Sequence, residues 1–196
     1  MNYLAHIFLS FNNAPITVGN VIADFVKGNK INDYQGDIKK GILIHREIDH
    51  YMDNHPIVKQ GKRRLSDYRH YSSVIIDIFY DHFLSKNWSN YSNEALDQFT
   101  KRNYTLLLNH KDIIPERASY LVYHMQKEDW LFNYQKIEGI QKTLDGMSRR
   151  TKFDSGMEKA TNNLIKDYTL LEDEFHMFFE NIIAHIHNFT DQLNSV

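Results

Sequence analysis

The sequence predicts an all-α protein: a single helical domain over residues 1–196, folded as a helical bundle with a long C-terminal helix. Apolar residues recur at steps of three and four along most of the chain, which is the period of an amphipathic helix. Eight glycines and three prolines in 196 residues favour long regular elements. No segment shows the apolar–polar alternation of a strand, and no internal repeat or low-complexity linker divides the chain.

The predicted helices follow in order along the chain. Residues 35–53 carry apolar side chains at helical spacing between lysines and arginines, and residues 71–88 form a strongly apolar helical segment. Pro56 and Pro115 stand where helices would begin, since a fixed φ suits a first turn. Ser92 is a candidate N-cap for the helix that follows it.

The last segment, residues 164–193, keeps the same apolar spacing. It predicts one helix of about 35–40 residues, long against an average near 12, packed along the body of the protein. Its apolar stripe would also suit a dimer seam, so both a monomer and a homodimer are open. We interpret His176, His185 and His187 on this helix as structural or exposed.

The composition limits the class of protein. The formal net charge of −2 gives no overall attraction to nucleic acid or to a membrane, so neither is expected as a partner. No run approaches the roughly 18 apolar residues of a membrane span, and the N-terminal stretch lacks the basic start of a signal peptide. The chain has no cysteine, which excludes disulfides and thiolate chemistry. We expect a cytoplasmic protein.

Asp77 and Asp81 stand four residues apart in the apolar segment 75–84, so they share one helix face. Like charges at that spacing repel, and burying two carboxylates costs free energy unless a cation or strong hydrogen-bond donors accompany them. A divalent metal ion is the partner that we favour. The alternative is that one aspartate faces water while the other forms a cap or pairs with an arginine.

His45 and Asp49 are also one helical turn apart, so an imidazole and a carboxylate can converge on one ion. Arg46 lies a third of a turn away from His45, and we consider it as a contact for a phosphate. A single histidine in such a segment is more often a core or surface residue than a ligand. His45 and Asp49 therefore indicate a metal site only in combination with the other candidate residues.

Two further features are weaker. Asp24 is the only acid in the apolar segment 18–28, and Lys27 follows three residues later. An ion pair between Asp24 and Lys27 on the surface is a simpler explanation than a functional role. His6 is an isolated histidine in an apolar helical stretch, where a hydrogen-bonded core histidine is more common than a ligand.

Together these segments resemble the acyl carrier protein phosphodiesterases, a divergent branch of the HD phosphohydrolase superfamily. The resemblance rests on Asn2-Tyr3-Leu4-Ala5-His6, Gly19-Asn20 with Ala23-Asp24-Phe25, His45-Arg46 with Ile48-Asp49, Asp53 with His55-Pro56, and Asp77 with Tyr80-Asp81-His82-Phe83-Leu84. These motifs lie in residues 1–88, and the length and helical remainder also suit the family. The chain has no adjacent His-Asp pair of the usual HD kind and carries Asp49-His50 and Asp81-His82 in the reverse order.

The resemblance implies an HD-like helical fold and a divalent metal, with manganese first and magnesium or iron as alternatives. The implied reaction is hydrolysis of the phosphodiester that joins 4′-phosphopantetheine to a serine of holo-acyl carrier protein, which connects the chain with fatty acid biosynthesis. The products are apo-acyl carrier protein and free 4′-phosphopantetheine. Holo-acyl carrier protein, an acidic protein, is then both partner and substrate.

With the resemblance, the candidate residues receive expected roles. The expected metal ligands are Asp24, His45, Asp49, Asp77 and Asp81. The catalytic candidates are His6 and His82, as ligands or as proton donors to the departing serine oxygen, and Lys27 and Arg46, as clamps on the phosphate oxygens. The candidates for docking the carrier protein are Lys59, Lys62, Arg63, Arg64 and Arg69, for which a solvated basic face is the alternative.

Two other functions remain open at this point. One is a metal-dependent phosphohydrolase that acts on a nucleotide or another small phosphoester with the same ligands. The other is a non-catalytic helical interaction protein, in which the histidines and aspartates are surface pairs.

Overall fold

The computed structural model describes residues 2–195, which form helices and connecting loops without a strand in that range. The α-helices are α1 (Tyr3–Phe8), α2 (Ala14–Ile22), α3 (Gly36–Asn54), α4 (Pro56–Arg64), α5 (Ser72–Lys86), α6 (Leu96–Asn109), α7 (Glu116–Lys127), α8 (Trp130–Asn133), α9 (Ile137–Ser148), α10 (Thr161–Lys166) and α11 (Tyr168–Asn194). The 3₁₀ turns are η1 (Ala23–Phe25), η2 (Gly28–Asp33), η3 (Ser66–Tyr71), η4 (Trp88–Asn90) and η5 (Met157–Lys159). The predicted all-α class is confirmed.

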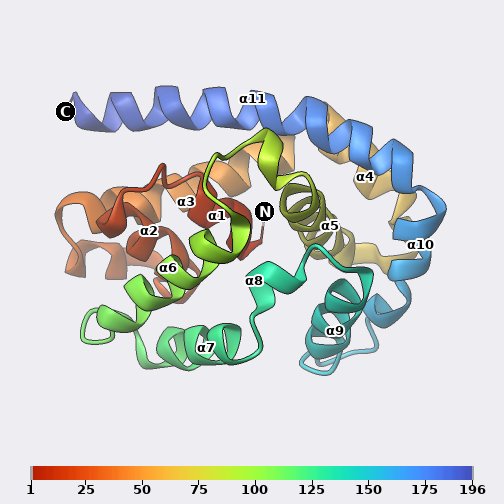
Figure 1. Cartoon of the computed structure of the whole chain (residues 1–196), viewed down its shortest axis with the longest axis horizontal. Helices are drawn as coiled ribbons and strands as arrows, with labels where there is room; N and C mark the ends of the chain where they lie inside the picture. Colours follow the sequence, from red (N-terminus) through yellow and green to blue (C-terminus); the bar gives the residue numbers. More distant parts are fainter. Residues whose placement is uncertain (1, 196) are drawn as a thin grey trace.

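Helix α11 runs along one side of the molecule and packs on α3, α4 and α5 (Figure 1). Helices α6 to α9 lie on the opposite side, with α1 and α5 between the two sides (Figure 1). The short helix α1 packs against α2 and α5. The buried apolar side chains form one cluster to which both sides contribute. This arrangement places the N-terminal helix inside the bundle.

Helices α2 and α3 approach each other almost backbone to backbone. A Cβ atom added at Gly19 would lie 2.0 Å from the carbonyl oxygen of Ile38, and one added at Gly41 would lie 2.2 Å from that of Ile16. Only glycine leaves room for this contact, because any side chain would overlap the facing backbone. The close crossing brings Asn20, which follows Gly19, to the side of α3.

Most predicted helix boundaries agree with the structure. The segments 35–53 and 71–88 correspond to α3 and α5, α4 begins at Pro56, and α7 begins directly after Pro115. Ser92 is not an N-cap, because α6 begins only at Leu96. Its hydroxyl instead accepts the N–H of Glu94 at 3.1 Å, in a turn that precedes the helix.

The prediction of one uninterrupted C-terminal helix is wrong. Asp167, with φ −107° and ψ 24°, separates α10 from α11, which has 27 residues. The apolar spacing gave no sign of this break because Leu164 before it and Leu171 after it are buried in the same core.

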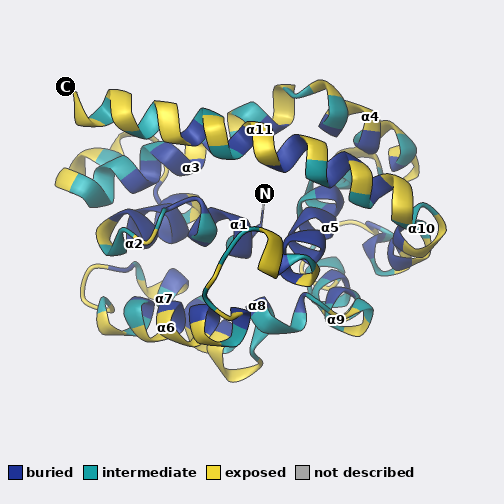
Figure 2. Cartoon of the chain, turned by 45° about the horizontal axis from the view of Figure 1, so that its top comes forward, coloured by how far each residue is buried: buried dark blue, intermediate teal, exposed yellow. Residues whose placement is uncertain are grey.

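The apolar stripe of α11 faces the interior of the protein. Its buried apolar residues are Leu171, Phe175, Phe178, Phe179, Ile182 and Ile186. Figure 2 shows exposed and buried positions alternating along this helix. The stripe therefore packs on the chain's own core. None of the described helices is both long and apolar enough to cross a membrane.

Candidate metal centre

Four of the predicted side chains meet beside the crossing of α2 and α3. His45 and Asp49 lie one turn apart on α3, His6 comes from α1, and Asp24 comes from η1. The imidazoles of His6 and His45 are buried, whereas the carboxylates of Asp24 and Asp49 are 57% and 45% exposed. The group is thus fixed on its inner side and open on its outer side.

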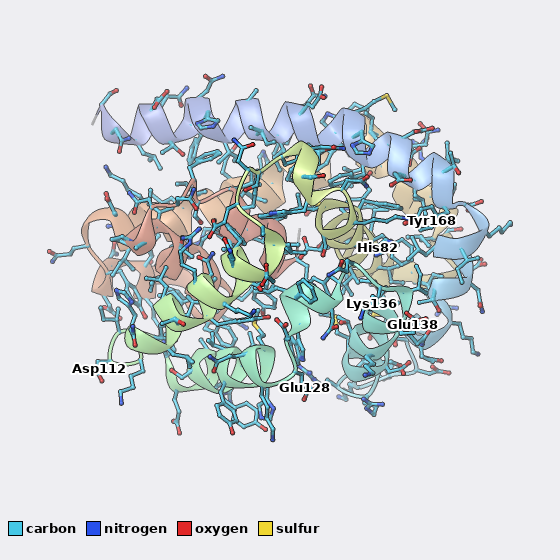
Figure 3. The ribbon with its side chains drawn as sticks, viewed as in Figure 1. His82, Asp112, Glu128, Lys136, Glu138 and Tyr168 are labelled. Carbon is cyan, nitrogen blue, oxygen red and sulfur yellow. The ribbon has the colours of Figure 1, made fainter. Side chains whose placement is uncertain are left out.

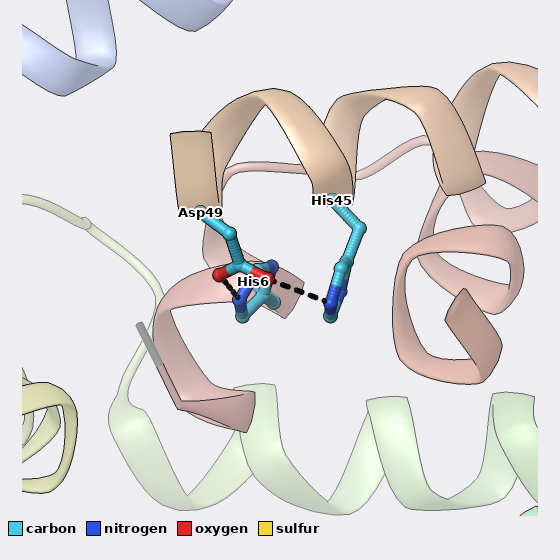
Figure 4. A group of neighbouring side chains, drawn as sticks. All are labelled: His6, His45 and Asp49. Carbon is cyan, nitrogen blue, oxygen red and sulfur yellow. Dashed lines mark ion pairs between the residues drawn. The ribbon is translucent and has the colours of Figure 1, made fainter. Parts of the chain in front are cut away.

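The carboxylate of Asp49 contacts both histidines (Figure 4). Its Oδ1 is 3.3 Å from Nε2 of His6, and its Oδ2 is 3.2 Å from Nε2 of His45. Nε2 of His45 is also 3.3 Å from Oδ1 of Asp24. The two imidazole rings stack with their centroids 4.1 Å apart and an angle of 19° between their planes. The Nε2 atoms of both rings therefore face carboxylate oxygens.

Asn20 fixes the proton positions of both rings. Its side-chain amide donates to the carbonyl oxygen of His6 at 2.8 Å and to the hydroxyl of Ser10 at 3.1 Å, so its Oδ1 is the acceptor facing His6. That oxygen lies 2.8 Å from Nδ1 of His6, and the Asn20 carbonyl oxygen lies 2.8 Å from Nδ1 of His45. Both Nδ1 atoms must donate, since neither oxygen can.

The ion pairs perturb the protonation of this group. Burial, and next the neighbouring His45, lower the pKa of His6 to about 4. Burial also disfavours a charge on His45, but hydrogen bonds to Asp24 and Asp49 overcome it and raise the pKa of His45 to about 9. Burial would raise the pKa of Asp49, yet its hydrogen bonds to His45 and His6 hold that pKa well below its usual range. The group thus binds positive charge strongly at neutral pH.

These donor atoms fit a divalent cation. One atom each from His6, His45 and Asp49 lie within 4.8 Å of one another, so a single ion can be reached by all three. Because Asn20 holds the proton of each Nδ1, the Nε2 atoms are on the side of the carboxylates, and a cation that displaces the Nε2 proton of His45 would find both Nε2 lone pairs there. Ligating histidines in metal sites are commonly oriented by such a second hydrogen bond. Imidazole and carboxylate together suit manganese, iron and zinc.

The group forms one wall of a cavity of about 330 Å³. The cavity is lined by Asn2, Tyr3, His6, Asp24, His45, Asp49, Asp53, Ser73, Val74, Asp77, Ile78 and Met147. Asp77, itself a predicted ligand, therefore faces the same space as Asp24, His45 and Asp49, and burial raises the pKa of its carboxyl group. The cavity has the size of a small-ligand site and carries four aspartates on its wall.

Asp81 has a different environment from the one that the sequence predicted. It is fully buried and accepts the N–H groups of Leu4 at 2.8 Å and Ala5 at 3.2 Å. These donors belong to the first turn of α1, which lacks partners within its own helix. Burial raises the pKa of Asp81 to about 7, against the lowering effect of these two bonds. Two backbone donors therefore accompany this buried carboxylate, as a capping role requires.

His82 also lies away from the group. Its Nδ1 is 2.7 Å from the carbonyl oxygen of Tyr134, and its Nε2 is 2.9 Å from the hydroxyl of Tyr168, beside which Figure 3 places it. It is not among the residues that line the cavity. His82 connects α5 to the loop after α8 and to the start of α11.

Lys27 and Arg46 are both exposed close to the group. Arg46 donates from Nη2 to the carbonyl oxygen of Val26 at 3.1 Å, which ties α3 to the loop that carries Lys27. Neither residue lines the cavity. The only support for a role in phosphate binding is therefore their place in the chain next to Asp24 and His45.

The basic segment after Pro56 is a helix beside the cavity, but two of its cations are already paired. Lys62 contacts Asp53, a lining residue, at 2.6 Å, and Arg64 pairs with Glu174, which is buried. Lys59, Arg63 and Arg69 are exposed and form no ion pair with a residue in the range 2–195.

Several residues of the site had no predicted role. Asn20, Tyr3 and Asp53 all stand within the motifs that suggested the family, so a signal was present. The motifs alone could not show which residues bind a metal and which hold the ligands in place. The hydrogen bonds of Asn20 depend on how α1, α2 and α3 pack. Met147 of α9 lines the cavity from a segment without any motif.

Comparisons with known proteins agree with these motifs. The sequence model of a family described as "Acyl carrier protein phosphodiesterase" matches residues 1–182. The chain is similar to proteins named acyl carrier protein phosphodiesterase from Yersinia enterocolitica (32% identity, 91% of this chain and 94% of the relative), Klebsiella pneumoniae (34%, 91% and 94%) and Escherichia coli O157:H7 (33%, 94% and 96%). No solved structure matches the chain.

Proposed function

Because the chain belongs to the acyl carrier protein phosphodiesterase family, we propose that it hydrolyses the phosphodiester between 4′-phosphopantetheine and a serine of holo-acyl carrier protein. The chain is a hydrolase of a phosphodiester, and its products are apo-acyl carrier protein and free 4′-phosphopantetheine. The proposed compartment is the cytoplasm, with which a chain free of cysteine is compatible.

We propose that the reaction depends on a divalent metal, manganese in the first place. The observation that carries this proposal is the convergence of His6, His45 and Asp49, with Asp24 at the same Nε2 atom of His45 that Asp49 contacts. The proposed ligands are these four residues. Asp81 is left out of the set because its oxygens already accept two backbone N–H groups. When bound, such an ion neutralises charge on the phosphoryl oxygens and lowers the pKa of a water molecule that attacks phosphorus.

The protein residues have separate tasks in this proposal. Asn20 keeps the Nδ1 protons of both histidines in place, so that the Nε2 atoms stay available on the cavity side. Asp77 faces the same cavity, and the raised pKa of its buried carboxyl group favours a proton there. We propose that Asp77 holds the proton that the serine oxygen takes up when it leaves, because the acid must lie within reach of that oxygen. Arg46 and Lys27 would attract the phosphate at the cavity mouth.

The test of the function is mass spectrometry of holo-acyl carrier protein after incubation with the enzyme and manganese. We expect loss of the prosthetic-group mass, and we expect none after treatment with a chelator or in Asp49→Asn. An intact holo-protein, together with hydrolysis of a nucleotide phosphoester under the same conditions, would replace this substrate with a small phosphoester. Elemental analysis of the purified protein tests the metal, since manganese or iron in about one equivalent is expected of a resident ion.

A further inference from the structure

A second basic segment lies next to the cavity, in the loop that follows α9. Residues 149–153, Arg149-Arg150-Thr151-Lys152-Phe153, carry three cations and no acid. The three cations are exposed, and the Phe153 ring is 72% exposed with the Lys152 ammonium 5.7 Å from its centre. We call residues 149–153 the α9 loop. The α9 loop therefore combines an exposed aromatic ring with three cations in a protein whose net charge is negative.

The α9 loop adjoins the cavity on the side opposite to α3. Met147, two residues before the loop, lines the cavity. The Arg150 side chain turns back along α9, with Nη2 3.7 Å from the position of a Cβ atom added at Gly146, the residue before Met147. The charge of the loop therefore extends to the cavity mouth.

The α9 loop also continues the basic surface of α4 and η3. Gly156, three residues after the loop, packs against the ring of Tyr68 in η3, which lies between Arg63 and Arg69 in the chain. The chain just beyond the α9 loop therefore lies against the chain between Arg63 and Arg69, although Gly156 and Tyr68 are 88 positions apart in the sequence (156 minus 68).

The cations of the α9 loop are available to a partner. Within residues 2–195, none of Arg149, Arg150 and Lys152 forms an ion pair. The acids that follow the loop are engaged elsewhere: Asp154 accepts the N–H of Gly156 at 3.2 Å, and Glu158 accepts the Ser148 hydroxyl at 2.7 Å.

The α9 loop has a defined shape. The Thr151 hydroxyl lies 2.8 Å from the carbonyl oxygen of Ser148 and 2.7 Å from that of Phe153. The Ser155 hydroxyl donates to that of Ser148 at 3.1 Å. A loop held by such bonds presents its charges with less loss of conformational freedom on binding.

We propose that the α9 loop is a docking surface for the acidic protein substrate, with Phe153 entering an apolar spot between carboxylates of the partner. The proposal rests on the proposed function, since the substrate must bring a phosphodiester on its own surface to the cavity. Charge complementarity favours an acidic protein, and an exposed ring at the centre of a basic patch suits a protein contact. A nucleic acid strand following this edge would meet the four aspartates on the cavity wall.

The test compares two charge-reversed variants of the full chain with equal changes in charge. Arg150→Glu/Lys152→Glu alters the α9 loop, and Arg117→Glu/Lys127→Glu alters exposed cations of α7 that line no part of the cavity. At low salt we expect the loop variant to raise KM for holo-acyl carrier protein about tenfold or more with kcat retained, because charges at the rim act mainly on encounter. The α7 variant should keep the KM of the wild type, and the effect on the loop variant should shrink at high salt.

A third variant tests the aromatic contact. Phe153→Ser should raise KM at low and high salt alike, because apolar contact is not screened. Equal manganese content and melting temperature in all variants show that the loop changes leave the site and the fold intact. An unchanged KM in both loop variants overturns the docking proposal while the proposed function stands.

The outcome for the function is separate. If the wild type leaves holo-acyl carrier protein intact, the proposed function is wrong. The docking proposal can still be tested by calorimetry, which compares binding of the carrier protein to the wild type and to the loop variant. Equal binding by both overturns it. Loss of binding to a single-stranded oligonucleotide in the loop variant, with an unchanged KM for the carrier, would assign the loop to nucleic acid instead.

Discussion

Gly19 of α2 and Gly41 of α3 lie face to face, so that a Cβ atom added to either would come within 3.0 Å of the Cα atom of the other. This contact sets the distance between the helix that carries Asn20 and the helix that carries His45. The 2.8 Å hydrogen bond from the His45 ring to the Asn20 carbonyl oxygen depends on that distance. The geometry of the candidate site therefore begins with two residues that have no side chain.

Gly41→Ala should damage both fold and site. The new Cβ would lie 2.2 Å from a backbone oxygen of Ile16, so α2 and α3 must separate. We expect a loss of about 1–3 kcal/mol or more in the free energy of unfolding, as for other overpacked cores, and weaker manganese binding. Gly146→Ala in α9 is the matched control, because its nearest neighbour is the flexible end of Arg150 at 3.7 Å. Chemical denaturation checks both, and equal stability of the two variants would contradict the argument.

Asn20→Ala should weaken metal binding without removing a ligand. The His6 ring loses its acceptor, whereas the His45 ring keeps the backbone carbonyl oxygen of residue 20. Loss of such a support typically lowers metal affinity by about 10–100-fold. Isothermal titration with manganese measures the change. Asn103→Ala is the control, since Asn103 is also buried but bonds only to the Phe99 carbonyl oxygen of its own helix. Wild-type affinity in a folded Asn20→Ala protein would remove Asn20 from the site.

Asp49→Asn should abolish the response of the protein to manganese. Asp49 is the residue that contacts both histidines, and an amide is a poorer partner for a cation. In the wild type, manganese at about 100 times its dissociation constant should add about 2.7 kcal/mol of stability and raise Tm. Asp37→Asn, on the same helix and paired only with Lys40 by charge, should keep this rise. A rise of equal size in Asp49→Asn would exclude Asp49 as a ligand.

Asp81 should make the metal-free protein less stable as the pH rises. The folded pKa of about 7 lies above the value near 3.9 of an unfolded aspartate, so the folded state holds the extra proton between those values. The contribution of Asp81 is full below about pH 4 and is lost as the pH rises through 7. Between pH 5 and 8 we expect a loss on the order of 2 kcal/mol, at about 1.4 kcal/mol per unit.

Chemical denaturation at the two pH values measures this loss. Asp81→Asn should reduce it, whereas Asp112→Asn on an exposed loop should not. The same loss in wild type and Asp81→Asn would assign the pH dependence to other groups.

Lys59→Glu/Arg63→Glu should raise KM for the carrier protein at low salt. Both cations are exposed on α4 beside the cavity, and reversing them repels an acidic partner. Arg64 is unsuitable for this test, because its loss would leave the buried Glu174 without its cation and cost about 3–5 kcal/mol. Arg117→Glu/Lys127→Glu again serves as the control. An unchanged KM would leave α4 as an ordinary solvated face.

The sequence predicted part of the site through helix geometry. His45 and Asp49 meet because residues four apart share a helix face, whatever surrounds them. The same rule failed to assign Asp81, since a carboxylate in an apolar helix can also be satisfied by the end of another helix, and only the tertiary structure tells which end lies there. His6 and Asp24 came from the resemblance to the family, because no spacing along the chain relates them to α3.

The fold shows the same division. Helix periods and prolines predicted α3, α4, α5 and α7 well, because those signals are local. The end of α10 at Asp167 and the contact of Gly19 with Gly41 were not predictable from periods. Both depend on which segment packs against them in the folded protein. A residue gives the same apolar pattern in the sequence whichever segment buries it.

The bond between Asp81 and α1 has a consequence for the order of events during synthesis. All four proposed ligands lie in the first 49 residues, yet α1 has six residues and is too short to be stable alone. The acceptor that holds its first turn stands 77 positions beyond Leu4. A growing chain thus carries every ligand well before it can bind an ion. With the proposed ligands, metal loading would be a late step of maturation that waits for α5 to leave the ribosome.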